Sequence, residues 1–125
     1  MPMSTDGVDL SILLRPDIPI RSFKERETIF RDGDRATEFY IIKDGSVRIQ
    51  LGNRTLSTLF SNDIFGEMAL IDDVSRTATA IAATDVTLVP ISEKQFLFLV
   101  SQTPFFALKV MRVLARRLLA SNKAV

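Results

Sequence analysis

Apolar and polar residues alternate in short runs along the first two thirds of the chain, and this alternation predicts β-strands. Between residues 46 and 51, for example, valine, isoleucine and leucine fall on one face, and arginine and glutamine fall on the other. Asp-Gly pairs at residues 32–33 and 44–45 are strong turn signals between such runs. Short strands separated by turns are typical of a sandwich or a jelly-roll barrel rather than a parallel sheet. The predicted strands cover residues 20–23, 27–30, 38–43, 46–51, 54–60, 77–83 and 86–91.

The last third of the chain changes to helical periodicity. Ser92 and Gln95 have the spacing of a capping box, which predicts a helix that begins directly after Ser92. Thr103 and Pro104 predict the start of a second helix, which we expect to extend over residues 105–122. This second helix carries an apolar stripe at helical spacing, as a core-facing side does. The stripe consists of Phe106, Val110, Val113 and Leu114.

Two features of this last helix point to contacts beyond a simple core stripe. Arg117 falls on the apolar stripe, where a guanidinium needs a partner unless its stem carries the charge out to solvent. A second apolar row has the a/d spacing of a coiled coil. That row predicts either one wide core-facing surface or a weak homodimer through this helix. It consists of Leu108, Met111, Ala115 and Leu118.

Composition narrows the class of protein. The 125 residues suit one domain with a real core, since 46% are hydrophobic and 25% are charged. The net charge of +1 gives no reason to expect nucleic acid or a membrane surface as a partner. Cysteine and histidine are absent, which excludes disulfides, most zinc sites and histidine-dependent catalysis. With no apolar run of membrane-spanning length, we expect a cytoplasmic protein that binds a ligand and is not an enzyme.

The stretch FGEMALIDDVSRTATA, residues 65–80, concentrates the candidate chemistry. Gly66 permits a tight turn, and the residues after it can form a helical turn whose free N–H groups favour an anion. Glu67 can accept a ribose hydroxyl, and Arg76 presents a fork of donors that suits phosphate oxygens. This set suits a nucleotide that carries one negative charge. The plain alternative is a loop between strands with a surface arginine and a solvated acid.

This stretch resembles the phosphate-binding cassette of the cyclic nucleotide-binding domain family, which includes sensor domains of catabolite activator proteins and of protein kinase A regulatory subunits. The family pattern is roughly FGE-x-AL-x and, after variable residues, PR-[ST/A]-A; the resemblance extends over residues 23–122. Ser75 stands where the family usually has proline, which loosens the turn but removes no contact group. The ligand contacts that the resemblance implies are Phe65, Gly66, Glu67, Met68, Ala69, Arg76, Thr77, Ala78, Arg117 and Ser121.

The resemblance also implies an architecture, which is mainly β with flanking helices. Residues 1–19 would be a mobile N-terminus with a short helix at residues 9–15. Residues 20–91 would be a jelly-roll barrel that contains the cassette at 65–78, and residues 92–125 would be two C-terminal helices. The last helix, 105–122, would act as a lid over the nucleotide. In the family this helix supplies an arginine and small polar residues, and Arg117, Ser121 and Asn122 fall at those positions.

The implied ligand is cAMP or cGMP, with no metal or other cofactor. We expect cAMP as the main ligand, because Thr77 permits guanine without requiring it. Ile42, Val47, Ile81 and Leu114 are the apolar residues expected to hold the base.

Alternatives from other functional classes stay open at this point. A protein-interaction domain of the same fold could have lost nucleotide binding, although the presence of Glu67 and Arg76 argues against that loss. A jelly-roll enzyme is disfavoured because the usual catalytic groups are lacking. The downstream protein is not indicated by the sequence. The chain could act alone as a sensor that signals through a partner, or it could be part of a longer chain.

Overall fold

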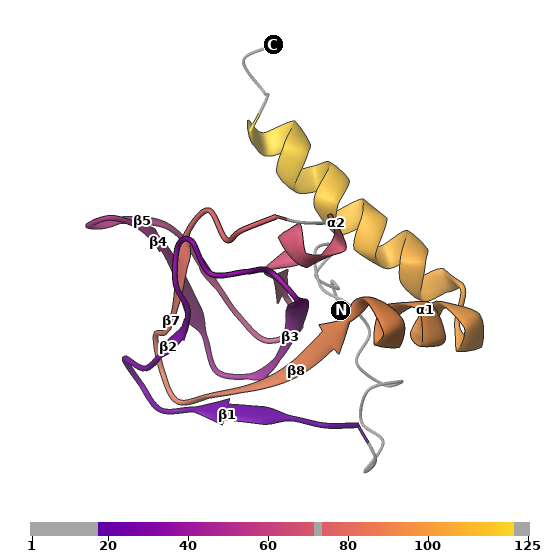
Figure 1. Cartoon of the computed structure of the whole chain (residues 1–125), viewed down its shortest axis with the longest axis horizontal. Helices are drawn as coiled ribbons and strands as arrows, with labels where there is room; N and C mark the ends of the chain where they lie inside the picture. Colours follow the sequence, from indigo (N-terminus) through magenta and orange to yellow (C-terminus); the bar gives the residue numbers. More distant parts are fainter. Residues whose placement is uncertain (1–17, 72–73, 122–125) are drawn as a thin grey trace, which may run out of the picture.

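The computed structural model describes residues 18–71 and 74–121. It is mainly β, with two antiparallel sheets followed by two helices (Figure 1). The strands are β1 (Arg21–Phe23), β2 (Thr28–Phe30), β3 (Glu38–Asp44), β4 (Val47–Leu51), β5 (Arg54–Leu59), β6 (Ile64–Phe65), β7 (Thr79–Ala82) and β8 (Val86–Ser92). The helices are the short 3₁₀ helix η2 (Glu67–Leu70) and the α-helices α1 (Glu93–Gln102) and α2 (Phe105–Ser121).

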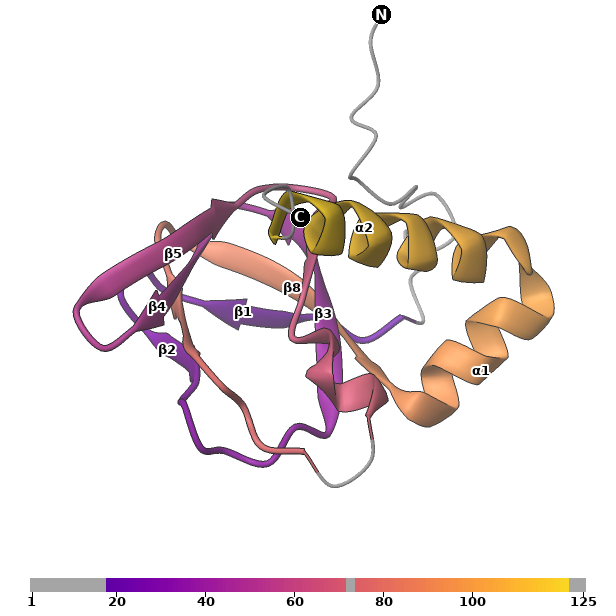
Figure 2. The same cartoon turned by 90° about the horizontal axis from the view of Figure 1, so that it is seen from above.

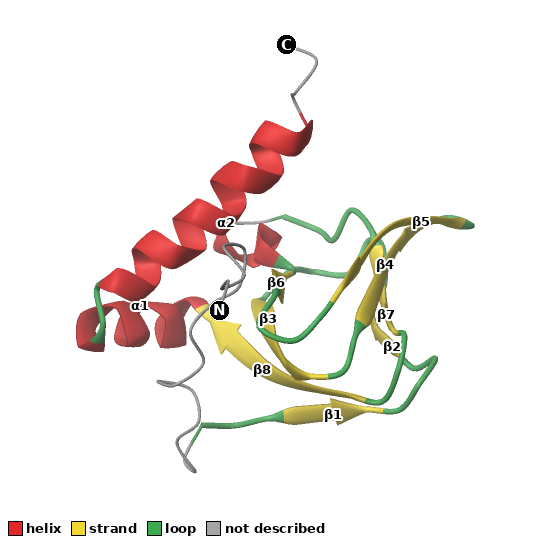
Figure 3. Ribbon diagram, turned by 180° about the vertical axis from the view of Figure 1, so that it is seen from behind, coloured by secondary structure: helices red, strands yellow, loops and turns green. Residues whose placement is uncertain are grey.

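The described strands form two four-stranded sheets. The first sheet has the order β1-β8-β3-β6, and the second has the order β2-β7-β4-β5. Figure 3 shows β3 and β8 on one side of the molecule and β4 and β7 on the other. Among the strands of the described residues, no strand of one sheet pairs with a strand of the other. The fold is therefore established as two antiparallel sheets with two helices, and closure into a jelly-roll barrel stays a prediction.

The first sheet is covered on both faces, and this explains its sequence. On β3, Phe39 and Ile41 pack toward the helices, whereas Tyr40 and Ile42 pack between the two sheets. All four are at most 4% exposed, so the strand reads as a continuous apolar run instead of an alternating one. On β5 of the second sheet, residues 54–58 are all exposed.

The two α-helices close the helix-facing side of the first sheet. Ser92 caps α1 with the predicted capping box, in which its side chain accepts from the Gln95 amide and the Gln95 side chain accepts from the Ser92 amide. Leu99 of α1 and Phe106, Val110 and Val113 of α2 are buried in one cluster with β3 and β8. Figure 2 shows α2 running from α1 toward the side of the molecule that holds β4 and β5.

The sequence predicted most of these elements, with one omission. The predicted strands correspond to β1–β5, β7 and β8, and both C-terminal helices are present, within the described residues. The short strand β6 was not expected. The predicted N-terminal helix at residues 9–15 and the last residue of the predicted lid, Asn122, lie outside the described residues. None of the helices described is long and apolar enough to span a bilayer.

Candidate functional site

The candidate site is built on the turn between β6 and η2. Phe65 of β6 lies opposite Tyr40 of β3 and is 2% exposed. The chain then turns at Gly66, whose φ of 78° and ψ of 21° lie in the left-handed region that favours glycine. Because η2 is a single turn, its dipole is small. An anion bound at this turn would therefore be held mainly by side chains.

The close approach of the Arg76 guanidinium also requires a glycine at position 66. A Cβ atom at this position would lie 2.9 Å from Nη1 of Arg76 and 3.3 Å from the ring of Phe30. The Gly66 carbonyl accepts a hydrogen bond from Nη1 of Arg76 at 2.7 Å. The glycine therefore allows the guanidinium to lie directly against the turn.

Arg76 is the buried cation of the site and is only 4% exposed. Its Nη2 donates to the backbone carbonyl of Glu38, and its Nε is buried without a hydrogen-bond partner. Within residues 18–71 and 74–121, no carboxylate forms an ion pair with it. Burial lowers the pKa of Arg76, an effect that Tyr40 and Glu38 oppose. A buried cation that has no carboxylate ion-pair partner is stabilised by an anion.

Glu67 and Arg117 form an ion pair across the site. Nη1 of Arg117 lies 2.8 Å from Oε1 of Glu67, and Nη2 donates to the carbonyl of Ile64. The Arg117 and Glu67 side chains are 34% and 26% exposed, respectively. Of the two alternatives that the sequence left open for Arg117, the structure therefore shows the one in which it has a partner. This contact joins α2 to the turn after β6.

These elements line a cavity of about 620 Å³. That volume lies within the range of roughly 300–1,000 Å³ that is usual for small-ligand sites. The residues predicted as contacts that line the cavity are Phe65, Gly66, Glu67, Met68, Arg76, Thr77, Ala78 and Arg117.

Two predicted contacts are placed differently. Ala69 lies in η2 but is not one of the residues that line the cavity. Ser121 ends α2, and its side chain is outside the described part of the structure.

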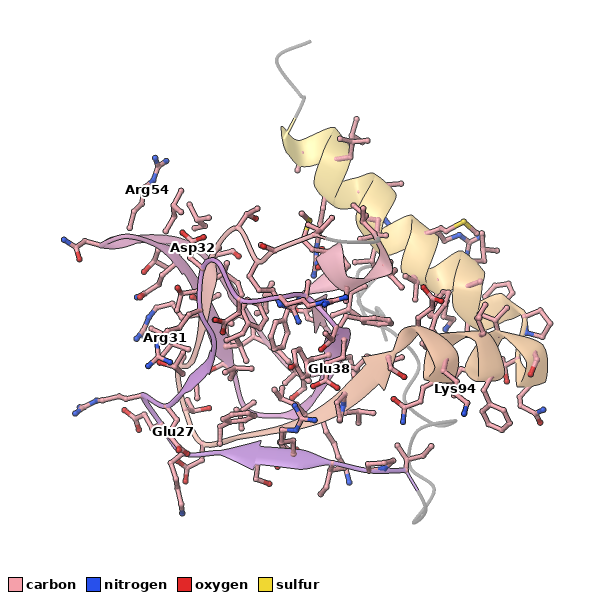
Figure 4. The ribbon with its side chains drawn as sticks, viewed as in Figure 1. Glu27, Arg31, Asp32, Glu38, Arg54 and Lys94 are labelled. Atoms are coloured by element: carbon pink, nitrogen blue, oxygen red, sulfur yellow. The ribbon has the colours of Figure 1, made fainter. Side chains whose placement is uncertain are left out.

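Figure 4 shows the side chains of the two sheets. Glu38 lies near the centre of the view, whereas Arg54 projects away at the end of β5.

The apolar residues predicted to hold the base do not line the cavity, and the strand register explains why. Ile42 and Val47 are fully buried between the sheets. Ile81 pairs with Arg48, whereas its neighbour Ala80 pairs with Ile49, so Ile81 faces away from the side that Ile49 occupies. Leu114 packs against the helix-facing core.

Several cavity residues were missed by the sequence reasoning. The alternation along β4 placed Ile49 on the same face as Val47. It could not show which residue of that face lines the cavity. Phe30 was seen only as the end of a strand. The missed lining residues are Phe30, Ile49, Leu56, Ser57, Leu59 and Ala120.

Known proteins are similar to this chain in sequence. Residues 20–103 match the family model described as the cyclic nucleotide-binding domain. The cyclic AMP receptor protein of Thermus thermophilus is 35% identical over 103 residues, a match that covers 78% of this chain and 48% of that protein. The chain thus spans about half the length of this relative.

Solved structures resemble the fold as well. The crystal structure of the Thermus thermophilus catabolite activator protein has a TM-score of 0.76 at 31% identity, over 89% of this chain and 58% of that one. The EAL enzyme Bd1971 has been solved in a cGMP-bound form, with a TM-score of 0.60 at 36% identity over 80% of this chain and 28% of that one. Its cAMP-bound form has a TM-score of 0.59 at 34% identity, over 84% and 30% of the two chains.

Proposed function

This chain belongs to the cyclic nucleotide-binding domain family, and we propose that its cavity binds a cyclic nucleotide, with cAMP as the main ligand and cGMP as a second one. The proposal rests on the position and surroundings of Arg76. It lines the cavity, is buried, and has an unpartnered Nε with no carboxylate partner among the described residues. The guanidinium edge suits the oxygens of a phosphate.

The charges of the site favour a ligand with one negative charge. Glu67 and Arg117 neutralise each other, and Arg76 is then the one lining residue of the described cavity whose charge is uncompensated. A cyclic phosphodiester carries one negative charge, whereas a 5′-monophosphate carries close to two at neutral pH. The cyclic form therefore leaves no excess charge in a partly desolvated site.

Glu67 is the proposed acceptor for the ribose 2′-hydroxyl. Arg117 bonds its Oε1, and a carboxylate has two oxygens with about four acceptor positions, so it can also accept a hydroxyl. The base would lie against the apolar wall formed by Ile49, Leu59 and Met68. Thr77 lines the cavity, and its hydroxyl can bond the guanine 2-amino group as well as the phosphate.

We propose that α2 acts as a lid and transmits the signal to a downstream protein. Arg117 and Ala120 of α2 line the cavity, and Arg117 already contacts the proposed ribose acceptor. A nucleotide that bonds Glu67 would add to this link and hold α2 closed. The outward face of α2 leaves Met111 57%, Leu118 63% and Leu119 70% exposed, which supports the proposal of a weak homodimer through this helix.

Isothermal titration calorimetry tests the proposal. The parent chain and Arg76→Ala are titrated with cAMP, cGMP and 5′-AMP. We expect heat with both cyclic nucleotides, weaker binding of 5′-AMP, and at least a tenfold loss for Arg76→Ala, because removing one member of a buried charge pair costs about 2–5 kcal/mol. If neither cyclic nucleotide gives heat or thermal stabilisation, the chain is instead a protein-interaction domain of the same fold.

A further inference from the structure

Three aromatic rings converge beneath the cavity from both sheets. Phe30 comes from β2 of the second sheet, whereas Tyr40 and Phe65 come from β3 and β6 of the first. Their ring centroids are 6.2 Å apart for Phe30–Tyr40, 6.0 Å for Phe30–Phe65 and 5.1 Å for Tyr40–Phe65. We call these residues the aromatic trio.

The guanidinium of Arg76 lies against this trio. Its central carbon is 4.0 Å from the centroid of the Phe30 ring and 5.9 Å from that of Tyr40. The guanidinium carbon therefore lies over the Phe30 ring, well within the distance of a cation–π contact. Phe30 also lines the cavity.

Two backbone carbonyls fix the guanidinium along its edges. Gly66 accepts from Nη1, and Glu38 accepts from Nη2. The ring therefore contacts the guanidinium carbon, and the two carbonyls hold its two Nη atoms. The Nε edge, which has no partner, keeps its hydrogen-bonding capacity.

We propose that Phe30 is a positioning residue for the anion: its ring holds the Arg76 guanidinium in place and lowers the cost of burying this cation before a ligand arrives. The inference rests on the proposed function and adds to it a residue that lies outside the 65–80 stretch. The negative face of an aromatic ring attracts a cation, and the attraction strengthens when water is excluded. Preorganised donors bind an anion more tightly because they need no rearrangement.

The first test compares Phe30→Leu with Phe23→Leu. Phe23 packs against the same core cluster and is not a cavity residue, so its replacement controls for lost core volume. Binding of cAMP and of adenosine, which lacks the phosphate, is measured for each variant, with adenosine followed by chemical-shift titration. We expect Phe30→Leu to lower cAMP affinity about tenfold, which is about 1.4 kcal/mol, and to change adenosine affinity by less than about twofold.

The second test keeps the shape of the ring. Position 30 alone receives di-, tri- and pentafluorinated phenylalanine, which progressively remove the negative charge from the ring face without removing the ring. We expect cAMP affinity to fall stepwise along the series. The midpoint of thermal unfolding without ligand should fall in the same order, because the ring stabilises the buried cation before the ligand arrives. This series also serves if Phe30→Leu does not fold.

The outcomes separate the two proposals. If the parent binds cAMP, and Phe30→Leu or the fluorinated series keeps parental affinity, only the positioning role is wrong. That role is also wrong if Phe30→Leu weakens adenosine as much as cAMP, or if Phe23→Leu weakens cAMP equally, because the effect would then come from cavity shape or core volume. A parent chain that binds neither cAMP nor cGMP overturns the proposed function and this inference together.

Discussion

Gly66→Ala tests whether the close approach of Arg76 to this turn matters for ligand binding. The new methyl group would lie 2.9 Å from Nη1 of Arg76 and 3.3 Å from the Phe30 ring, so the guanidinium has to move away from the turn. The φ of 78° would add the strain of a left-handed alanine. Gly52→Ala is the matched control, because Gly52 has a φ of 61° and open space around its Cβ position.

The two variants differ by a magnitude that follows from these contacts. Left-handed backbone costs an L-residue about 1–2 kcal/mol, and both variants carry this cost. Gly66→Ala also weakens the 2.7 Å hydrogen bond from Arg76 to the Gly66 carbonyl. A hydrogen bond from a charged group contributes about 1.5–3 kcal/mol. We therefore expect the free energy of unfolding to fall by about 1–2 kcal/mol in Gly52→Ala and by about 2.5–5 kcal/mol in Gly66→Ala.

Urea unfolding and calorimetry with cAMP measure the two effects. A small domain has about 5–15 kcal/mol of stability, so Gly66→Ala should still fold. We expect it to bind cAMP at least tenfold more weakly than the parent, whereas Gly52→Ala should bind as the parent does. If the two variants lose equal stability and both keep parental affinity, the guanidinium is not held against the turn and the reasoning fails.

Four further predictions follow from the site. Glu67→Gln should weaken cAMP binding. A ligand without the 2′-hydroxyl should lose less affinity in this variant than in the parent, and equal losses of affinity would contradict the ribose contact. Thr77→Ala should lower cGMP affinity about fivefold more than cAMP affinity, because one hydrogen bond contributes about 1 kcal/mol. Equal losses for the two nucleotides would mean that Thr77 contacts only the phosphate. Amide hydrogen exchange of residues 105–121 should slow with cAMP, and unchanged exchange would defeat the lid. Burial, with Glu38 as a further cause, raises the pKa of Tyr40 to about 12. Tyr40 is the only tyrosine and tryptophan is absent, so tyrosinate absorbance should show a midpoint near 12, and a midpoint near the ordinary 10 would show that the hydroxyl reaches water.

The direction of the Tyr40 shift also fixes its effect on stability. A raised pKa in the folded state means that the folded protein holds its proton after the unfolded chain has released it. The free energy of unfolding should therefore fall as pH rises from about 10 to about 12. Tyr40→Phe should remove this contribution.

Local patterns in the sequence predicted the elements well, because their causes are local. The alternation along β4 and the capping box of Ser92 and Gln95 need only neighbouring residues, and both are present in the structure. Strand β6 has only two residues and is formed by its pairing with β3. Nothing within residues 64–65 could have predicted it.

The cassette residues were predictable for the same reason, whereas the walls of the cavity were not. Arg76 and Glu67 lie in one ordered motif. Phe30, in contrast, contacts Arg76 only because β2 and β7 pair and bring residue 30 opposite Ala80. Likewise, Ile49 and Val47 share one face of β4, but depth along the strand decides that Ile49 lines the cavity and Val47 does not. Both outcomes depend on how the sheets pack, which alternation along one strand does not determine.

The aromatic trio has a consequence for the order in which this protein assembles. One of its rings belongs to the second sheet and two belong to the first, so the surface that supports Arg76 forms only when the sheets have docked with their side chains fixed. A compact state with intact strands but fluctuating packing would lack that surface. A nucleotide can then stabilise the finished domain by mass action, but it cannot serve as a template on which the unfolded chain begins to fold.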